Sequence, residues 1–355
     1  AGTGYKEMTK TLLYAADLAS RIGDRKMRIG IKPNLVTPSP AEYGATTHTE
    51  VVAGIIEYLQ EQHFGDLTVA EGSWIGDRTS EAYEYCGYRT LCETYHVPFV
   101  DTQKEKWHRI PCAGMELSVT DVTDRIDFWI NVPVLKGHCQ TKMTCALKNF
   151  KGLLPNAEKS RFHRMGLHKP IAHLAAGLKQ DFVVVDHICG DLDFEEGGNP
   201  VVRNVVMAAA DPVLVDAYAC YILGLTPDDV PYVRMAEKLG VGCADLSRAE
   251  IVDLGGGTAE ERPRASRLLD VAYSVEEADS CSACYASLCG ALLRLKEEGL
   301  LEKIPCPIGI GQGMRGKTGK LGVGRCTKDF EVSVPGCPPK EEDIYRVLRE
   351  YIGQA

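Results

Sequence analysis

The sequence predicts an α/β protein, with a large domain built on a mainly parallel sheet with helices on both faces, and a small C-terminal α/β unit. Two observations indicate the large domain: short apolar runs alternate with segments of helical periodicity, and the alternation continues over about the first 250 residues. A third observation indicates the second unit, because six of the 14 cysteines fall between residues 281 and 337. A chain of 355 residues is also long enough for two domains.

The elements of the large domain can be assigned in order along the chain. Apolar runs that stop at Pro, Gly or Asp are typical of buried strands, which we expect at 27–35, 66–72, 97–101, 125–135, 181–188 and 201–210. Apolar residues at helical spacing predict helices at 5–22, 47–62, 80–95, 141–154, 168–180, 211–225 and 230–240. We expect Thr47 or Thr49 to cap the second helix and Asp211 to cap the helix that starts at Pro212. Strands that alternate with helices favour a parallel sheet.

The character of the sequence changes after residue 255. The glycine-rich start of segment 255–269 predicts a linker, so we expect domains at 1–255 and 268–355. In the second domain the same criteria predict helices at 283–298 and 340–352, and strands at 304–313 and 330–336.

Composition argues against several classes of partner. The formal net charge of −9 disfavours nucleic acid or an anionic membrane as a general partner. No apolar run approaches the roughly 18–20 residues that a membrane span needs. The first residues show no charged segment followed by an apolar one, so we expect no signal peptide and a cytoplasmic protein.

Four cysteines are expected on tight turns of the second unit. Cys281-x2-Cys284 opens a helix, Gly324-x-Cys326 follows a strand, and Gly336-Cys337-Pro338-Pro339 joins a strand to a helix. Iron–sulfur clusters are held by thiolates, and glycine lets the backbone turn with positive φ and come close to the cluster. The pattern predicts one four-iron four-sulfur ([4Fe-4S]) cluster.

This pattern resembles the proximal-cluster domain of nickel–iron hydrogenase small subunits and of the related complex I subunit, with shorter spacings here. The resemblance implies that the ligands are Cys281, Cys284, Cys326 and Cys337. Either of two further cysteines could replace one of these four, namely Cys289 or Cys306. The alternatives are a structural zinc site, which also uses paired cysteines, and disulfides or free thiols.

A basic, histidine-rich stretch lies in the large domain. Residues 136–173 hold eight Lys or Arg and four His against a single acid, Glu158. Within a chain of net negative charge, this stretch creates a focused positive field that attracts a carboxylate or a phosphate. The alternative for Lys142, Lys148 and Lys151 is an exposed helix face.

The same stretch supplies candidate site residues, because ligands of open parallel sheets bind beyond the carboxyl ends of the strands. We expect acid–base roles for residues that lie past a strand or flank a turn, since imidazole titrates near neutral pH: Lys136, His138, His163 and His168. We expect substrate-binding roles for Lys32, Asn34, Lys142 and Lys148. His173 lies on an apolar helix face and is expected to belong to the core.

An acidic segment follows the strand at 181–188. Asp186 is expected to end that strand, and further acids crowd the loop after it: Asp191, Asp193, Glu195 and Glu196. Such oxygens could bind Mg²⁺ or Ca²⁺, but the spacing is not that of an EF-hand, and an exposed acidic loop is the favoured interpretation.

Several separate motifs resemble the bacterial and archaeal domain of unknown function 362 family. They are "IKPNL", "INVPVLKGHCQTKMTCALKNFKGLLP", "FHRMGLHKPIAHL", "VVVDHICG" and "AAADPVLVDAYACYILGL", and they span most of residues 28–240. Members are often linked to iron–sulfur modules, although the usual run of Cys-x2-Cys-x2-Cys-x3-Cys is missing here. The strand-end Lys/His stretch is also similar in layout to the lactate racemase apoprotein family, from which we carry over no reaction.

These observations lead to one expected function and two alternatives. We expect a cytoplasmic iron–sulfur protein of anaerobic-type metabolism that binds an anionic small molecule and exchanges single electrons with it or with a ferredoxin-like partner. The first alternative is a non-redox lyase or isomerase with a structural or Lewis-acid cluster, and the second is an accessory or sensor protein that binds a ligand without turnover. No glycine motif with nucleotide-binding spacing supports a flavin or NAD.

Overall fold

A computed structural model gives the structure of residues 4–193, 195, 200–255 and 267–354, so most of the predicted linker and Glu196 lie outside the described residues. The chain divides into two compact units. The first contains residues 1–137 and 143–264, and the second contains residues 138–142 and 265–355.

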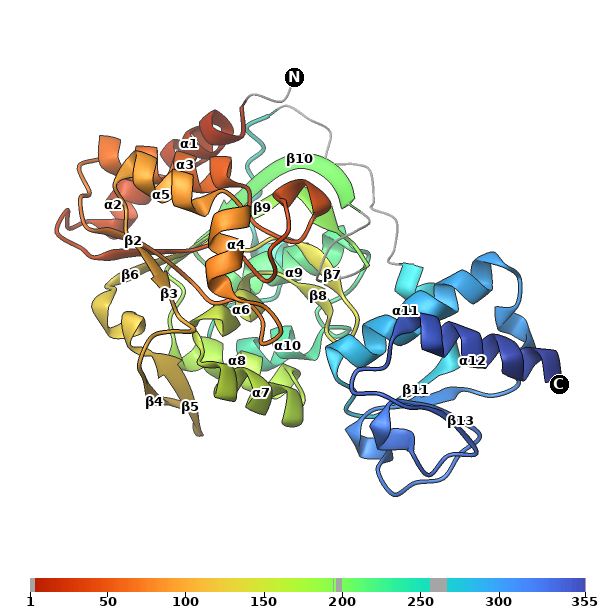
Figure 1. Ribbon diagram of the computed structural model, residues 1–355. Coiled ribbons are helices and arrows are strands. Elements are labelled where there is room, and N and C mark those ends of the chain that lie inside the picture. Colours follow the sequence, from red (N-terminus) through yellow and green to blue (C-terminus); the bar gives the residue numbers. More distant parts are fainter. Residues whose placement is uncertain (1–3, 194, 196–199, 256–266, 355) are drawn as a thin grey trace. The chain divides into compact units, whose positions relative to one another are not determined.

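The large unit is built on a six-stranded sheet with the order β10-β9-β6-β1-β2-β3 (Figure 1). Five strands are parallel, and β10 pairs antiparallel with β9 at one edge. The strands are β1 (Ile29–Lys32), β2 (Leu67–Glu71), β3 (Phe99–Asp101), β6 (Phe128–Asn131), β9 (Phe182–Asp191) and β10 (Pro200–Ala209). Every residue of β1, β6 and β9 is buried, as a parallel sheet covered on both faces requires. The predicted α/β class is therefore confirmed.

Alternate residues of each strand serve two separate cores, because successive side chains of a strand point to opposite faces. Ile31, Val69 and Val184 pack on the face that is covered by α1 (Tyr5–Ala15), α2 (Leu18–Ile22), α3 (Thr49–Glu61), α4 (Thr79–Tyr85) and α5 (Tyr88–Tyr95). Trp129 and Val185 pack on the other face, covered by α6 (Ala146–Asn149), α8 (His168–Gly177), α9 (Pro212–Ile222) and α10 (Pro231–Lys238).

Three helical segments differ from the sequence prediction. The helix expected at 5–22 breaks at Asp17, which has a φ of 49°, and the helix expected at 80–95 breaks at Gly87, which has a φ of 78°. The segment 141–154 forms a short strand, β8 (Lys142–Thr144), then α6 and the 3-10 turn η3 (Phe150–Leu153). The residue before α3 is His48 and makes no side-chain cap, so the expected threonine cap is wrong.

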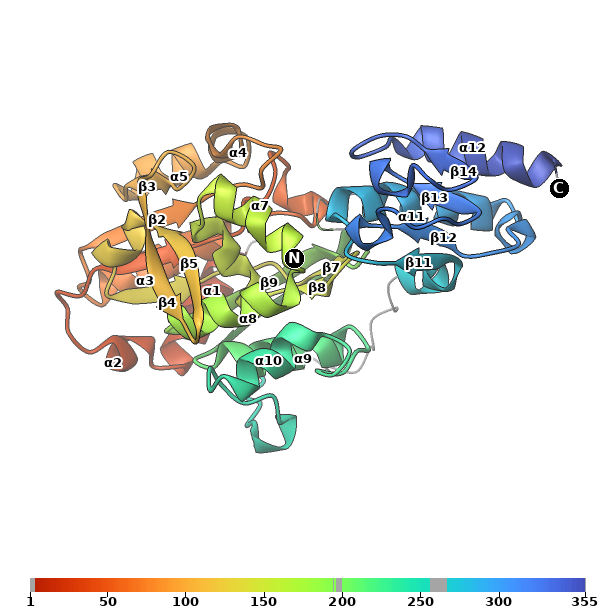
Figure 2. The same cartoon turned by 90° about the horizontal axis from the view of Figure 1, so that it is seen from below.

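A β-hairpin that the sequence did not indicate packs beside α8 (Figure 2). It consists of β4 (Trp107–Cys112) and β5 (Met115–Thr120). The His173 ring Nδ1 lies 3.0 Å from the carbonyl oxygen of Cys112, within hydrogen-bond distance, and the side chain is half-buried rather than part of the core. A second short hairpin pairs β7 (Lys136–His138) with β8, and α7 (Asn156–Arg164) precedes α8.

The small unit has a sheet of its own in which all four strands are parallel, with the order β11-β12-β13-β14. The strands are β11 (Val275–Glu277), β12 (Ile308–Ile310), β13 (Leu321–Val323) and β14 (Val332–Val334). Two helices, α11 (Ser282–Glu297) and α12 (Glu341–Gln354), pack against each other in this unit (Figures 1 and 2). None of the helices in the described ranges is both long and apolar enough to cross a membrane.

The sequence prediction that Asp211 caps the following helix is confirmed. Asp211 Oδ1 accepts hydrogen bonds from the backbone N–H groups of Val213 (2.8 Å) and Leu214 (3.0 Å), and its Oδ2 accepts one from Cys243 N at 2.8 Å. The carboxylate therefore joins the start of α9 to the chain that follows α10.

We expect Asp211→Ala to lower the free energy of unfolding by about 1–2 kcal/mol, because three backbone N–H groups lose their acceptor. Urea denaturation measures the change. Asp245→Ala is the control, because Asp245 caps only an exposed 3-10 turn and should cost less than about 0.5 kcal/mol. Equal losses in the two variants would contradict the bridging role of Asp211.

Candidate functional site

The candidate site lies at the carboxyl ends of the parallel strands of the large sheet. Lys32 is the last residue of β1, Glu71 the last of β2, and Asn131 the last of β6. Because β2 and β6 both pair with β1 in parallel, their ends meet at one edge, where ligands of open α/β sheets usually bind.

Lys32 and Glu71 form a buried ion pair at this edge. Their side chains are 1% and 3% exposed, and Lys32 Nζ also donates to Pro33 O at 2.8 Å and to Asn149 Oδ1 at 3.1 Å. Burial lowers the pKa of Lys32 and the charge of Glu71 opposes this effect. Gly152 lies directly against the pair, since a Cβ atom at this position would overlap Glu71 Oε1.

Asn149, in the last turn of α6, connects the ion pair to its neighbours. Its Oδ1 accepts hydrogen bonds from Lys32 and from Asn34 Nδ2 at 2.8 Å, while its Nδ2 donates to Asn131 Oδ1 at 2.7 Å. Asn131 in turn donates to Gln180 Oε1 at 2.6 Å. These contacts assign the orientation of the Asn149 side-chain amide, with its Oδ1 facing the ammonium group of Lys32.

Two more lysines extend the network toward Glu195. Lys136 Nζ donates to Asn34 Oδ1 (3.1 Å), Ala45 O (2.6 Å) and Glu195 O (2.8 Å). Lys148 pairs with the Glu195 carboxylate and donates to Thr144 Oγ1 at 3.0 Å. Four of the residues that the sequence suggested are thus joined in one network: Lys32, Asn34, Lys136 and Lys148. Lys148 is 3% exposed, so the alternative of an exposed helix face is wrong for it.

Lys159 and Lys151 complete the group of cations. Lys159 Nζ donates to the carbonyl oxygens of Gly72 (2.9 Å) and Ser73 (2.8 Å), which follow β2. Burial, partly offset by Glu71, lowers the pKa of Lys159 to about 8. Burial and then the charge of Lys148 lower the pKa of the half-buried Lys151 to about 7. Two lysines of this edge therefore exchange protons near neutral pH.

A buried carboxyl group positions α6. Asp216 on α9 accepts hydrogen bonds from Ala146 N at 2.7 Å and Leu147 N at 3.1 Å, at the start of the helix that carries Lys148 and Asn149. Burial raises the pKa of Asp216 to about 7, although the two N–H donors oppose this effect. Asp216 is thus a positioning residue for the network.

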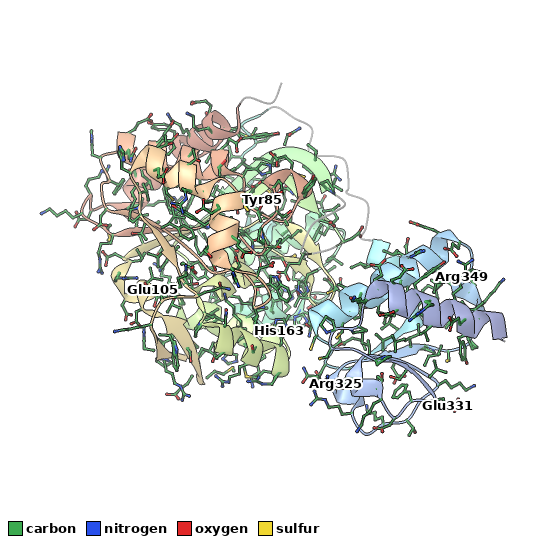
Figure 3. All side chains as sticks on the ribbon, viewed as in Figure 1. Tyr85, Glu105, His163, Arg325, Glu331 and Arg349 are labelled. Atoms are coloured by element: carbon green, nitrogen blue, oxygen red, sulfur yellow. The ribbon has the colours of Figure 1, made fainter. Side chains whose placement is uncertain are left out.

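The other predicted residues lie elsewhere. His138 and Lys142 belong to the second compact unit; Lys142 is exposed, and His138 Nδ1 accepts from the backbone N–H groups at Gln140 (3.1 Å) and Thr141 (3.0 Å). Two acceptor contacts at Nδ1 assign the ring proton of His138 to Nε2. His163 is on α7 (Figure 3). His168 starts α8 and stacks on Tyr232 with a centroid distance of 5.8 Å. Their expected acid–base roles stay predictions.

The favoured interpretation of the acidic segment is wrong for three residues. Asp186, Asp191 and Asp193 are buried, and Asp186 lies within β9 rather than at its end, because the strand continues to Asp191. Asp186 Oδ2 accepts from His48 N and faces His48 Nδ1, both at 2.8 Å. Burial disfavours the charged ring, but the hydrogen bond and charge of Asp186 outweigh it and raise the pKa of His48.

In the small unit, the four predicted ligands lie at the carboxyl edge of the sheet. Cys281 precedes α11 and Cys284 lies in its first turn, after β11. Cys326 follows β13 and Cys337 follows β14, in turns where Gly324 and Gly336 have φ values of 89° and 137°. At both glycines, positive φ is a conformation that residues with a Cβ rarely adopt.

Hydrogen bonds connect these turns. Gly324 N donates to Val334 O at 2.8 Å, and Arg325 N donates to Gly336 O at 2.9 Å, so the turns of Cys326 and Cys337 lie side by side. A Cβ at Gly324 would lie 3.9 Å from Cys284 Sγ. The turn after β12 contributes Gln312, whose Nε2 donates to Cys281 Sγ at 3.7 Å.

The four thiols affect one another electrostatically. Burial, followed by the charges of Cys337 and Cys326, raises the pKa of Cys281. Burial, followed by the charges of the other three cysteines, raises the pKa of Cys284 to about 12. Four thiolates here would repel one another unless a cationic group bound them, and the iron–sulfur cluster expected for this set stays a prediction. In the part of the chain that the structure describes, no three His, Cys, Asp or Glu side chains form a site for a single metal ion.

The sequence did not indicate several members of the large-unit network, among them Glu71, Asn149 and Lys159. Glu71 had a signal, because it ends the predicted strand at 66–72 and the strand-end criterion that selected Lys32 applies to it equally. Asn149 and Lys159 follow no strand, and their roles depend on helix positions that the sequence does not specify.

Comparisons with known proteins match part of this chain. A family model described as "Domain of unknown function (DUF362)" matches residues 29–221, which end before the cysteine-rich unit. The thylakoid-associated protein sll1697 of Synechocystis sp. is 27% identical over 227 residues, which cover 60% of this chain and 68% of that protein. The structure of the lactate racemase apoprotein from Thermoanaerobacterium thermosaccharolyticum is also similar, with a TM-score of 0.43 and 14% sequence identity. The match covers 62% of this chain and 55% of the racemase chain.

We expect Glu71→Gln to lower the free energy of unfolding by about 3–5 kcal/mol, because it removes one partner of a buried ion pair. Urea denaturation near neutral pH measures this change. The control is Glu84→Gln, which breaks an exposed pair with Arg89 and should cost less than about 1 kcal/mol. A loss for Glu71→Gln as small as that of the control would show that the pair does not hold this edge together.

Proposed function

The chain belongs to the domain of unknown function 362 (DUF362) family, and from this premise we propose that it is an iron–sulfur protein that binds a small anionic compound at the carboxyl edge of its large sheet. The anion is a carboxylate or a phosphate, because ammonium groups and amide N–H groups recognise both. The cluster is one [4Fe-4S] centre bound by Cys281, Cys284, Cys326 and Cys337.

The observation that carries the anion site is the presence of four buried lysines at one edge of the sheet, and the lowered pKa of two lysines supports it: the buried four are Lys32, Lys136, Lys148 and Lys159. Lys151 and Lys159 lie among other buried cations, and the pKa of each falls to within about one unit of neutrality. The described carboxylates of the network, Glu71 and Glu195, pair with Lys32 and Lys148. A bound anion would compensate the remaining charge and favour the protonated lysines.

The cysteine set supports the cluster, which would supply one-electron chemistry. Gln312 donates a hydrogen bond to the sulfur of Cys281, and Arg315 interacts with the sulfur of Cys326. Donors to ligand sulfurs stabilise the more negative, reduced form of such a centre. Exchange with a ferredoxin-like partner stays a prediction.

The second candidate function is a non-redox lyase or isomerase with a structural cluster. Its support is the same pair of lysines, because groups with a pKa of about 7 and about 8 can accept and return protons at neutral pH without any electron transfer. Substrate turnover that persists when the cluster is redox-silent would favour this candidate.

We expect anion affinity to fall as pH rises. About one pH unit below 7 both lysines are mostly protonated and the anion binds best; about one unit above 8 both are mostly neutral. Each lysine whose positive charge the anion needs should raise Kd by up to about tenfold per pH unit, as that lysine loses its proton across this window. Calorimetric titration with sulfate or malonate measures it, since both probes keep a constant charge between about pH 6.5 and 9.

Lys159→Met should raise Kd for these probes by about 10- to 100-fold, the value of a charge-assisted hydrogen bond. Lys26→Met, at an exposed lysine in the loop before β1, is the matched control and should leave Kd unchanged. Binding that is equally strong across the pH range, or equally affected by both substitutions, would contradict the proposed site.

For the cluster, protein purified without oxygen should contain about four iron and four sulfide per chain, and dithionite should change its EPR spectrum. Cys337→Ser should lose or disturb this signal, because it removes one of the four thiolates. Cys306→Ser is the matched control, since Cys306 lies before β12 and not among the turns at the carboxyl edge. Zinc in place of iron, or loss of iron from the control alone, would refute this ligand set.

A further inference from the structure

Lys151 differs from the other lysines of the site in its contacts. The amines of the others donate to defined oxygens: Lys32 to Glu71, Lys136 to Ala45, Lys148 to Glu195, and Lys159 to Gly72 and Ser73. The Lys151 amine has no hydrogen-bond or ion-pair partner in the described chain, although the side chain is half-buried. A half-buried amine without an acceptor is available for a ligand.

The backbone around Lys151 is held firmly at the carboxyl edge. Lys151 lies in the turn η3 directly after α6, and its carbonyl oxygen accepts from Leu154 N at 3.1 Å. The next residue, Gly152, accepts a hydrogen bond from Thr102 Oγ1 at 2.6 Å and lies against the Lys32–Glu71 pair. Lys151 is therefore presented from a packed element and not from a loose loop.

The neighbours of Lys151 suit a carbonyl compound that also bears a negative charge. Burial and the charges of Lys148 and Lys159 disfavour the protonated form of Lys151, and the charge of Glu195 offsets only part of this effect. With a pKa of about 7, a large fraction of the Lys151 amine is neutral at neutral pH, whereas an exposed lysine is almost fully protonated. A neutral amine beside cationic groups is the usual nucleophile toward carbonyl substrates.

We propose that Lys151 forms an imine with a small aldehyde or ketone whose carboxylate or phosphate group is held by the neighbouring lysines. The inference rests on the proposed anion site and names the substrate class of that site. Lys151 Nζ attacks the carbonyl carbon, a C–N bond forms, and the carbonyl oxygen leaves as water after proton transfer. Addition of water reverses the reaction, so no oxidant or reductant is required.

An imine on Lys151 would activate the bound compound for loss of a proton or a carboxylate. A protonated imine withdraws electrons from the adjacent carbon, so a proton or a carboxylate on that carbon is lost more readily. Lys159 lies in the same group of lysines and also has a pKa near neutrality, so it suits the transfer of that proton.

Trapping with borohydride tests the proposal on the full chain. Pyruvate is the probe, because it combines a ketone with a carboxylate, and reduction converts the imine into a stable secondary amine. Mass spectrometry should show a single adduct, and peptide mapping should place it on Lys151. Acetone, which has the ketone but no anion, should label far less, and excess malonate should suppress labelling by pyruvate.

Lys151→Met should abolish the adduct, whereas Lys26→Met, at the exposed lysine used above, should leave it unchanged. If Lys151→Met fails to fold, peptide mapping of the unsubstituted protein still locates the label. Labelling spread over exposed lysines, or absent while malonate still binds, would overturn the imine and leave the anion site standing. If neither malonate binding nor labelling is found, the proposed function and this inference both fail.

Discussion

The buried ammonium group of Lys32 imposes the requirement around which the large unit is organised at its carboxyl edge. A lysine side chain that is 1% exposed needs a countercharge and hydrogen-bond acceptors. The adjacent chain supplies only one of them, the carbonyl oxygen of Pro33, which directly follows β1. Glu71 arrives from β2 and Asn149 from α6, so the ends of two strands and a helix must meet at one point. Gly152 allows the backbone after α6 to approach the pair, and Asp216 holds the start of α6 in place.

Such an arrangement is not an efficient way to stabilise a fold. A buried ion pair gains little over well-packed apolar residues, because the cost of desolvation offsets the attraction between the charges. Here the cost is increased by further lysines, two of which have their pKa lowered toward neutrality. A concentration of buried cations with shifted pKa values is more typical of functional sites than of structural cores. The proposed anion site accounts for a charge distribution that folding alone would not favour.

The small unit applies the same geometric rule to a different chemistry. Its four parallel strands also end at one edge, and three of the turns at this edge carry the cysteines that the sequence singled out. The turn after β12 contributes Gln312 instead, as a donor to sulfur. Both units gather side chains at strand ends, with amines in one and thiols in the other, and in the small unit glycines set two of the turns. The carboxyl ends of parallel strands meet at one edge in each unit, so residues that follow separate strands become neighbours.

The sequence by itself determined the α/β class, most strand and helix positions, the Asp211 cap and the strand-end lysines, because hydrophobic periodicity and turn residues are local properties. It did not separate buried from exposed charges: Lys148, Asp186, Asp191 and Asp193 were expected or allowed to be exposed, and all four are buried. Only the tertiary structure decided that Asn149 joins Lys32 to Asn34, that His48 meets Asp186, and that Lys151 keeps an amine without an acceptor. The physical reason is that burial and pairing of a charge depend on residues 100 or more positions apart, as in the Lys32–Asn149 and His48–Asp186 contacts, and no local pattern records which strand ends become neighbours.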